Sequence, residues 1–355
     1  MRGYTLASIM LFFLLAFTSI SQDEDNQRLL YLPDGTNPGE AECENRRSTC
    51  EIAIITADGD LLQTFAVDIL KDPSSTDVSA DGRYFHNGGV VVDLRDGAIT
   101  QLHTEDDGRA AWGSWPHIGD QLAYTYQQPD EDGNLNAIMG YRLHITDIDQ
   151  TDTLIVDDLN VYGEPTWSLD DAQVFIAGTE GDDVEDAWHL YQIDVETGNY
   201  EAIYTFDRLA FLSADISPDG TQLVFSSALS EDDQTNNLLL LDIETGETTA
   251  LTDTTGQVYV AQWSPDGTAI TYHYTDDPST TASLRLLMLE TGEITELTQQ
   301  TTIGGYHWSL DGTQIAYIGG DRDNSDVCIV DVITVDEQCL DVDAHWLGTP
   351  FWLSD

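Results

Sequence analysis

A five-residue turn sequence recurs along the chain and restricts its fold more than any other feature. Residues 263–267 read Trp-Ser-Pro-Asp-Gly. Five further copies occur, two close, two looser and one degenerate, at residues 216–220, 308–312, 167–171, 78–82 and 115–119. The spacing between neighbouring copies runs from the high thirties to the low fifties, which is close to the length of one four-stranded propeller blade.

Each repeat unit reads as four short β-strands. The first strand ends in Trp-Ser, and Pro-Asp-Gly supplies a tight turn in which glycine can take positive φ. A β-rich run such as Leu223–Ser226 follows, then a polar loop and a third strand such as Leu238–Asp242. A Glu-Thr-Gly turn, as at residues 244–246, leads into the fourth strand. No helical periodicity of useful length appears between Gln22 and Asp355.

Six complete units and two end fragments predict a closed ring of seven blades. The units begin near Val78, Trp115, Trp167, Ile216, Trp263 and Trp308. The N-terminal fragment supplies a second, third and fourth strand, at Arg28–Leu32, Glu51–Thr56 and Leu61–Phe65. We predict the missing first strand at Ala344–Trp346, because Ala-His-Trp mirrors Tyr306–Trp308. The expected fold is an all-β, seven-bladed propeller of four-stranded antiparallel blades, closed by a C-terminal strand that leaves no free sheet edge.

The N-terminus predicts export. Arg2 precedes an apolar run over residues 6–17, and small serine residues follow before Gln22, as in a secretory signal peptide. We therefore expect residues 1–21 to be a signal peptide and residues 22–355 to form one extracytoplasmic domain, secreted or periplasmic. The alternative is an uncleaved N-terminal anchor, although a membrane span usually needs about 20 apolar residues. Nothing later in the chain is apolar enough to cross a membrane.

The four cysteines form two close pairs, Cys43 with Cys50 and Cys328 with Cys339. Export makes disulfides the expected state, and proximity selects this pairing among the three that four cysteines allow. If residues 333–334 form the tip of a hairpin, Cys328 lies directly opposite Cys339, at a Cα separation of about 4.5–5.5 Å that a disulfide can bridge. A zinc site is the alternative, but neither pair has Cys-x-x-Cys spacing and no histidine accompanies them.

The charge of the chain is extreme, with 65 acidic residues against 12 basic ones. Such a field repels nucleic acid and anionic membrane surfaces and favours a soluble monomer. One interpretation is a solvated surface suited to a salt-rich or calcium-rich medium, in which screening removes the self-repulsion. The other is an acidic face directed at a cationic partner or a metal. Because the acidic residues are spread along the whole chain, we favour the first.

The repeat resembles a known family. Trp-Ser-Pro-Asp-Gly followed by a β-run and Glu-Thr-Gly-Glu is similar to the PD40 repeat of TolB-like propellers, which also occurs in the propeller domains of prolyl oligopeptidase relatives. The resemblance extends over nearly everything from Arg28 onward and implies the fold. TolB carries an additional N-terminal α/β domain and prolyl oligopeptidases carry a hydrolase domain. This chain has no room for the first and lacks the second.

The chain lacks the common local motifs of catalysis. No Gly-x-Ser-x-Gly elbow, phosphate loop, Gly-x-Gly-x-x-Gly or His-Glu-x-x-His segment is present. Propeller active sites gather residues from several blades, however. The residue that precedes the first-strand Trp, or its equivalent, is polar in every unit, namely Asp77, Ser114, Thr166, Asp215, Gln262, His307 and His345. We expect these side chains to line the central channel, near the face that carries the long loops.

Four of these residues form a candidate metal site from consecutive blades: Asp215, Gln262, His307 and His345. Carboxylate, amide and imidazole donors together suit a divalent transition metal. The set is similar to the metal site of oligogalacturonate lyases, which uses histidines and a glutamine, but it has two histidines where that site has three. The alternative is a wet, polar channel that binds nothing. His86 and His273 end second strands, where they could supplement the site, but we expect them to be surface histidines.

The acid-rich second-to-third-strand loops should lie together on one face of the ring. They are residues 128–136, 180–186, 231–237, 275–280 and 321–326. The last of them has alternating acids that could hold calcium, but it lacks the sixth-position Gly and twelfth-position Glu of an EF-hand loop. Aspartates also recur at third-strand ends, where we expect them to accept local backbone N–H bonds, at Asp93, Asp147, Asp194, Asp242 and Asp331.

Three functions compete at this level. The leading hypothesis is a non-catalytic exported module that holds a protein or glycan on its loop-rich face, which rests partly on analogy of fold. The second is a metal-dependent, lyase-like enzyme acting on carbohydrate at the channel mouth. The third is a subunit whose acidic face docks a cationic partner, which binding that persists unchanged at high salt would contradict.

Overall fold

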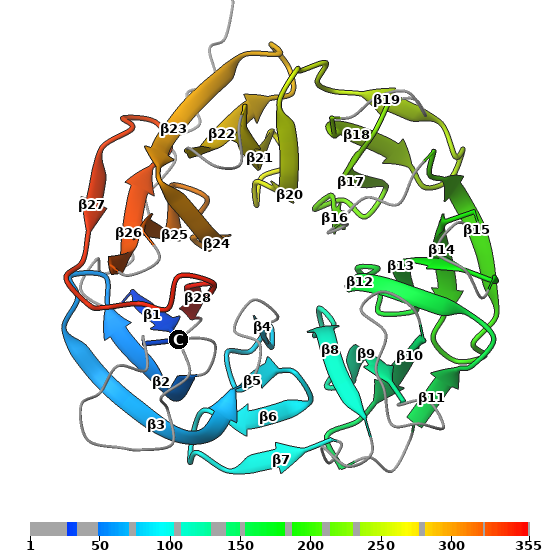
Figure 1. Cartoon of the computed structure of the whole chain (residues 1–355), viewed down its shortest axis with the longest axis horizontal. Coiled ribbons are helices and arrows are strands. Elements are labelled where there is room, and N and C mark those ends of the chain that lie inside the picture. Colours follow the sequence, from blue (N-terminus) through cyan, green and yellow to red (C-terminus); the bar gives the residue numbers. More distant parts are fainter. Residues whose placement is uncertain are drawn as a thin grey trace, which may run out of the picture.

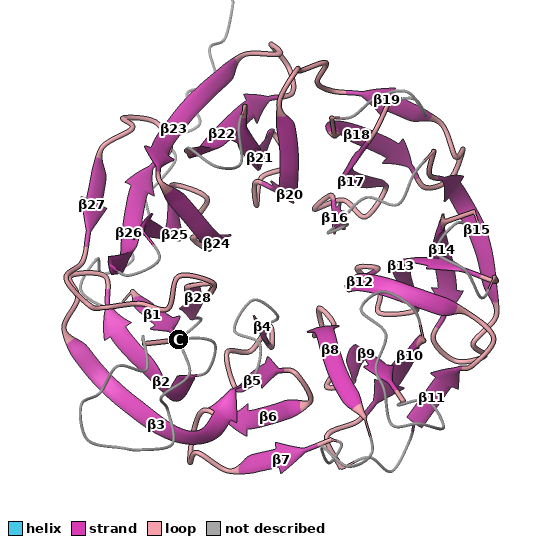
Figure 2. Ribbon diagram, in the orientation of Figure 1, coloured by secondary structure: helices cyan, strands magenta, loops and turns pink. Residues whose placement is uncertain are grey.

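The computed structural model describes residues 27–33, 49–70, 76–102, 108–128, 140–149, 153–181, 187–207, 214–229, 235–276, 281–321 and 324–353. Within these ranges every regular element is a β-strand, and the strands form seven four-stranded sheets. The sheets stand around a central axis as the blades of a ring (Figures 1 and 2). No helix in the described part of the chain is long and apolar enough to cross a membrane. The predicted signal peptide lies outside the described residues.

The strands follow the repeat in chain order. Blade 1 consists of β28 (Phe351–Leu353), β1 (Arg28–Tyr31), β2 (Thr49–Thr56) and β3 (Leu61–Leu70). Blade 2 consists of β4 (Thr76–Val78), β5 (Tyr84–Asn87), β6 (Val90–Asp93) and β7 (Ile99–Gln101). Blade 3 consists of β8 (Arg109–Ser114), β9 (Leu122–Gln127), β10 (Tyr141–Thr146) and β11 (Thr153–Val156). Blades 4 and 5 consist of β12 (Asn160–Trp167), β13 (Gln173–Thr179), β14 (His189–Asp194) and β15 (Tyr200–Thr205); β16 (Ala214–Ile216), β17 (Gln222–Ser227), β18 (Asn237–Asp242) and β19 (Thr248–Ala250). Blades 6 and 7 consist of β20 (Gln257–Trp263), β21 (Ala269–Thr275), β22 (Ala282–Met288) and β23 (Ile294–Gln300); β24 (Thr302–Trp308), β25 (Gln314–Asp321), β26 (Asn324–Asp331) and β27 (Glu337–Cys339).

The hydrophobic core is divided among the junctions between blades. Seven clusters of buried apolar side chains occur in the described residues, one at each junction. In β25, Ile315 and Tyr317 pack against blade 6, whereas Ala316 and Ile318 pack against blade 1. Successive side chains of a strand point to opposite faces, so a strand buried on both faces reads as a continuous apolar run. This agrees with the almost continuous burial of second strands such as β9, β13 and β17.

The C-terminus closes the ring, as predicted, but through a different segment. The first strand of blade 1 is β28, in which Trp352 pairs with Leu29 and Phe351 with Leu30. Trp352 packs against blade 7, and Phe351 packs against blade 2. The prediction of Ala344–Trp346 as this strand is therefore wrong by seven residues. The true counterpart of the repeat tryptophan is Trp352.

The Ser-x-Asp turns are built alike in five blades, each with a hydrogen bond from the serine hydroxyl to the aspartate. In blade 6 the Ser264 hydroxyl donates to Asp266 at 2.7 Å and accepts from the Ala269 backbone N–H at 3.0 Å, while Gly267 has φ 71°. The residue between Ser and Asp lies next to the turn glycine of the following blade. A Cβ on Gly267 would lie 3.6 Å from Pro218, and one on Gly312 would lie 3.4 Å from Pro265. The turns thus form a ring, and we call the side that they occupy the turn face.

Blade 4 departs from this pattern, and its turn provides a hydrogen-bond acceptor for the turn of blade 3. Asp171 stands where the other turns have glycine, and it adopts φ 56°. Its carboxylate accepts three consecutive backbone N–H bonds from the degenerate turn of blade 3, from His117 at 2.8 Å and from Ile118 and Gly119 at 2.9 Å. The degenerate turn lacks the usual Ser and Asp, so the carboxylate of the next blade supplies the acceptor that its backbone needs.

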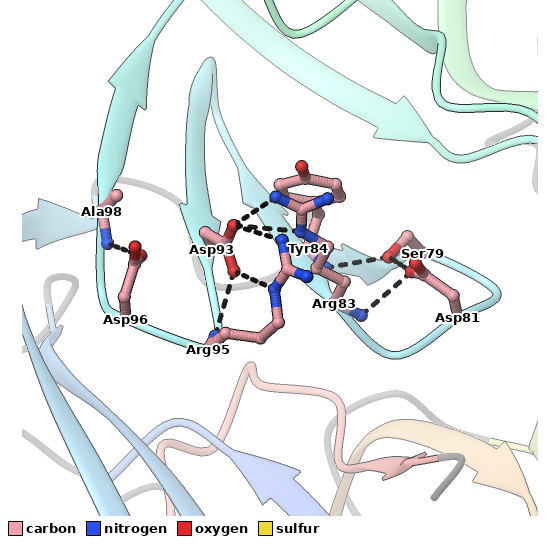
Figure 3. A network of polar contacts seen from close by, with 8 residues as sticks. All are labelled: Ser79, Asp81, Arg83, Tyr84, Asp93, Arg95, Asp96 and Ala98. Carbon is pink, nitrogen blue, oxygen red and sulfur yellow. Dashed lines mark hydrogen bonds and ion pairs between the residues drawn. The ribbon is translucent and has the colours of Figure 1, made fainter.

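Four of the five aspartates at the ends of third strands have the predicted local role, and for Asp147 that role stays a prediction. Asp194, Asp242 and Asp331 each accept a backbone N–H three residues on, at 2.7 to 2.8 Å. In blade 2 the corresponding Asp93 also accepts from the Arg83 guanidinium at 2.8 Å and from Arg95 (Figure 3). Burial alone would raise the pKa of Asp93, but the two arginines lower it to about 2.

One of the two predicted disulfides lies in the described structure. Cys328 is the register partner of Cys339, and a disulfide joins them between β26 and β27. This confirms the hairpin prediction for that pair. Cys43 lies outside the described residues, so its pairing with Cys50 stays a prediction.

Candidate functional site

Two adjoining cavities occupy the central channel. The inner one, of about 370 Å³, is lined by Asp77, Glu164 and Asp215 among others. The outer one, of about 460 Å³, is lined by residues of five turns, including Pro265 and Leu310. Asp215, Gln262 and His307 line both. The expectation that these residues lie near the loop-rich face is wrong: they stand at the ends of first strands, so they lie at the turn face.

The acid-rich second-to-third-strand loops were predicted to lie together on the opposite face. They fall largely outside the described structure, at residues 129–139, 182–186, 230–234, 277–280 and 322–323, so their placement stays a prediction. The calcium hypothesis for the last loop likewise stays a prediction.

Five of the seven polar residues that precede the repeat tryptophans, or their equivalents, tie their blade to the next. Asp77 accepts from the backbone N–H of Trp115 at 2.8 Å, and Asp215 accepts from that of Trp263 at 2.7 Å. The other ties run from side-chain donors to carbonyl oxygens of the next first strand, from Ser114 to Pro165 at 2.6 Å, from Thr166 to Ala214 at 2.8 Å and from Gln262 to Tyr306 at 3.1 Å. These five side chains therefore join blades 2 to 7.

His345 does not belong to this set. Its side chain is fully buried, and its Nδ1 accepts from the Leu347 backbone N–H at 3.2 Å. Its backbone N–H donates to Leu32 at 2.8 Å, so it continues the pairing beside β1 and does not line either cavity. The equivalent channel position of blade 1 is Phe351, whose ring lies 5.4 Å from that of His307.

The structure brings three of the four predicted metal ligands, Asp215, Gln262 and His307, to the same cavities. Both carboxylate oxygens of Asp215 accept backbone N–H bonds, from Ile216 at 3.0 Å and from Trp263. Among the residues that the structure describes, no group of three or more His, Cys, Asp and Glu side chains could hold a metal ion. The arrangement therefore gives the metal hypothesis no support, and it stays a prediction.

The channel contains one acidic residue that the sequence reasoning missed. Tyr162 pairs with Ala177 and Thr166 with Phe175, so residues 163–165 form a bulge opposite Ile176. The bulge places Glu164 at the inner cavity, where its carboxylate has no hydrogen-bond or ion-pair partner in the described structure. Bulges commonly redirect a side chain in this way. A charged residue inside a predicted innermost strand was the signal available in the sequence.

Burial disfavours charge throughout the channel. It raises the pKa of Asp77 to about 7 and that of Asp215 to about 6, against the opposing effect of the backbone N–H bonds. For Glu164, burial and then the negative charges of Asp77 and Asp215 raise the pKa to about 8. Burial lowers the pKa of His307 to about 4, so this imidazole is neutral at pH 7.

Two further histidines differ from their prediction. His86 is fully buried and His273 is half-buried, whereas both were expected at the surface. His86 accepts from the Gly89 backbone N–H at 3.2 Å, and the ring of His273 lies 5.0 Å from that of Tyr306. Burial lowers their pKa values to about 3 and about 4. Both are core histidines behind the channel wall.

These shifts predict that Glu164 makes stability fall as pH rises near neutrality. A carboxyl group whose folded pKa is above its unfolded value binds a proton that the unfolded chain has lost, so its contribution is present at low pH and disappears as pH rises through the folded pKa. For Glu164 that loss ends near pH 8. Replacing it with Gln should increase the free energy of unfolding at pH 8 by about 1–2 kcal/mol and flatten its slope between pH 6.5 and 8.

Urea unfolding at pH 6.5, 7.0, 7.5 and 8.0 in constant salt measures this slope. Glu293→Gln, at an exposed turn, is the matched control, because it removes one charge from the general repulsion without touching the channel. Equal slopes in Glu164→Gln and in Glu293→Gln would contradict the prediction. The measurements stop at pH 6.5, because below that pH the histidines of the unfolded chain take up protons that the buried histidines of the fold do not. The free energy of unfolding then falls for this second reason.

Comparisons with known proteins agree with this architecture. Similar solved structures are an oligogalacturonate lyase in complex with manganese (17% identity, 75% of this chain and 76% of that chain, TM-score 0.56) and an oligogalacturonate lyase from Vibrio parahaemolyticus (14%, 75% and 76%, 0.55). A putative dipeptidyl aminopeptidase IV from Bacteroides ovatus is also similar (13%, 86% and 52%, 0.52). At these identities the likeness concerns the fold alone.

A search of the curated proteins found no match. The family model described as PD40, the TolB beta propeller domain, matches residues 117–345, which is more than half of the chain. These residues include the turns of blades 4 to 7, the ties made by Thr166, Asp215 and Gln262, and the channel residues Glu164 and His307. The protein therefore belongs to the TolB-type PD40 β-propeller family.

Proposed function

We propose that this protein is an exported, non-catalytic binding or scaffold module that holds a protein or glycan. The observation that carries the proposal is the use of the channel side chains. Five of these side chains form hydrogen bonds with the backbone of the neighbouring blade, namely Asp77, Ser114, Thr166, Asp215 and Gln262. Groups engaged in this way stabilise a rigid ring and are not free to transfer protons to a substrate. Export is supported by the disulfide between Cys328 and Cys339.

The alternative is a metal-dependent, lyase-like enzyme with its site at the channel mouth. One observation favours it: His307 lines both cavities, and its buried Nδ1 has no partner in the described structure. A neutral imidazole of this kind could accept a metal or a proton. The neighbouring Asp215 and Gln262 are engaged elsewhere, so a metal would have to break existing ties.

Metal analysis and thermal unfolding distinguish the two. We expect the purified protein to carry no stoichiometric transition metal, to melt within a degree or two of the same temperature with manganese or with a chelator, and to leave oligogalacturonate unchanged. His307→Ala should alter none of these. One equivalent of bound metal that disappears in His307→Ala would overturn the proposal and favour the enzyme.

A further inference from the structure

The turn face presents apolar side chains around the channel mouth. We define the apolar rim as Ala80, Ile118, Leu169, Pro218, Pro265 and Leu310. Five of them are the residue between Ser and Asp of a repeat turn, and Ile118 belongs to the degenerate turn. Ile118 is 81% exposed and Leu310 is 60% exposed. Five of the six rim residues are exposed and Leu169 is half-buried, which is unexpected on a chain of net charge −53, and such patches mark interaction sites.

Exposed aspartates accompany this rim. One aspartate follows the rim residue in each of five turns, at Asp81, Asp170, Asp219, Asp266 and Asp311, and all five are exposed. The serine hydroxyl that bonds each one, at 2.7 to 2.8 Å, fixes its position. Those bonds hold the pKa of Asp170, Asp219 and Asp266 below the ordinary value. The mouth thus combines an apolar surface with exposed acidic side chains.

The floor of the same opening is acidic as well. Beneath the outer cavity lies the inner one, with the carboxyl groups of Asp77, Glu164 and Asp215. The carboxylates of Asp77 and Asp215 are each bonded by two backbone N–H groups, but that of Glu164 has no partner in the described structure. A cationic group entering the cavity would favour the ionised form of Glu164 and give its carboxylate a partner, whereas an anionic group would add to the negative charges of Asp77 and Asp215 that already raise its pKa.

We propose that the apolar rim docks a basic protein segment, in which apolar side chains rest on the rim and a lysine or arginine side chain enters the channel toward Glu164. Charge complementarity selects this occupant, because the exposed aspartates and the acidic floor both favour a cation. The apolar rim adds the requirement that the segment also carry apolar side chains, which charge alone does not impose. The inference deepens the proposed function, on which it rests, by naming one face and the chemistry of its partner.

An array of synthetic heptapeptides with randomised central positions tests the partner chemistry. With the purified protein in 0.15 M salt, we expect peptides that carry Arg or Lys between two apolar residues to be retained at least tenfold over peptides with Gln or Glu in the central position. They should also exceed peptides in which Ser replaces the apolar flanks. No enrichment, or enrichment that follows basic content alone, would overturn the proposal, since net charge attracts any cation.

Variants locate the binding. Leu310→Ser and Ile118→Ser should weaken the best peptide at least fivefold, measured by fluorescence anisotropy. The matched control is Ile333→Ser, which removes an isoleucine that is 82% exposed in the third-to-fourth-strand turn of blade 7 and outside the rim. Glu164→Gln should weaken an Arg-containing peptide and leave its Gln counterpart unchanged. Equal effects of Leu310→Ser and Ile333→Ser would contradict docking at the rim.

A second copy of the chain is the competing occupant. Sedimentation velocity that shows a dimer, lost in Leu310→Ser, would assign the rim to self-association and overturn the proposal. The two proposals can fail separately. Metal-dependent turnover with intact peptide binding would refute only the non-catalytic function, whereas absent peptide binding with no metal and no turnover would refute only the docking of a basic segment.

Discussion

A chain that ends at Asp343 is expected to lose cooperative folding. The deletion removes β28, whose Phe351, Trp352 and Leu353 are at most 8% exposed and fill the junctions on both sides of blade 1. Burial of three large apolar side chains contributes about 5–9 kcal/mol, which is comparable with the whole stability of a typical domain. The edge of β1 would also lose its hydrogen-bond partners.

Urea unfolding followed by tryptophan fluorescence, together with near-ultraviolet circular dichroism, measures the loss. A chain lacking only its last two residues is the control, because it keeps β28 and Ala344, which forms a bridge with Pro33. We expect the control to unfold like the full chain, and the longer truncation to give a broad, early transition. A sharp transition at the original midpoint would show that the ring closes without β28.

Replacing Gly305 with Ala is expected to destabilise the same closure by at least about 3 kcal/mol. The segment before β28 lies against β24 so closely that a Cβ on Gly305 would stand 1.8 Å from the hydroxyl of Thr349 and 2.9 Å from its Cα. The Gly305 backbone N–H donates to Gly348 at 2.9 Å. Relief of the clash would require this hydrogen bond and the adjoining strand to move, since backbone as well as side chain is in the way.

Two comparisons isolate the clash. Gly246→Ala places the same methyl group where nothing lies within 4 Å, at φ 71°, so it should cost only the left-handed strain of about 1–2 kcal/mol. Adding Thr349→Gly to Gly305→Ala should restore part of the stability, because it removes the nearest atoms. If Gly305→Ala unfolds at the same urea concentration as Gly246→Ala, close packing of the closure segment is not the cause.

The repeat allows most of the fold to be predicted, because each turn motif carries its own strand order and its own hydrogen bonds. The closing strand was misplaced for a physical reason. Ala344–Trp346 looks like a first strand, but register is set by the pairing of Trp352 with Leu29, a contact between opposite ends of the chain that local sequence does not encode. The sequence therefore predicts that a closing strand must exist, but not which residues form it.

The candidate site was less predictable. The polar positions before the tryptophans were recognised, but their role in joining blades was not, because composition cannot show that Asp215 meets the backbone of Trp263. Glu164 was missed because a bulge, invisible in a period-two pattern, brings it to the channel. Placement of the set near the loop-rich face failed because these residues end their strands.

The carboxylate of Asp171, held by three N–H groups of the preceding blade, has a consequence for how the repeats can diverge. Two neighbouring repeats depart from the common turn sequence: the turn of blade 3 lacks the usual Ser and Asp, and the turn of blade 4 has Asp171 in place of glycine. The turn of blade 3 depends on the carboxylate of Asp171 for its acceptor, so we expect the two positions to be inherited together. Homologues should carry both departures or neither, and a blade copied or transplanted from this ring would have to move with its neighbour.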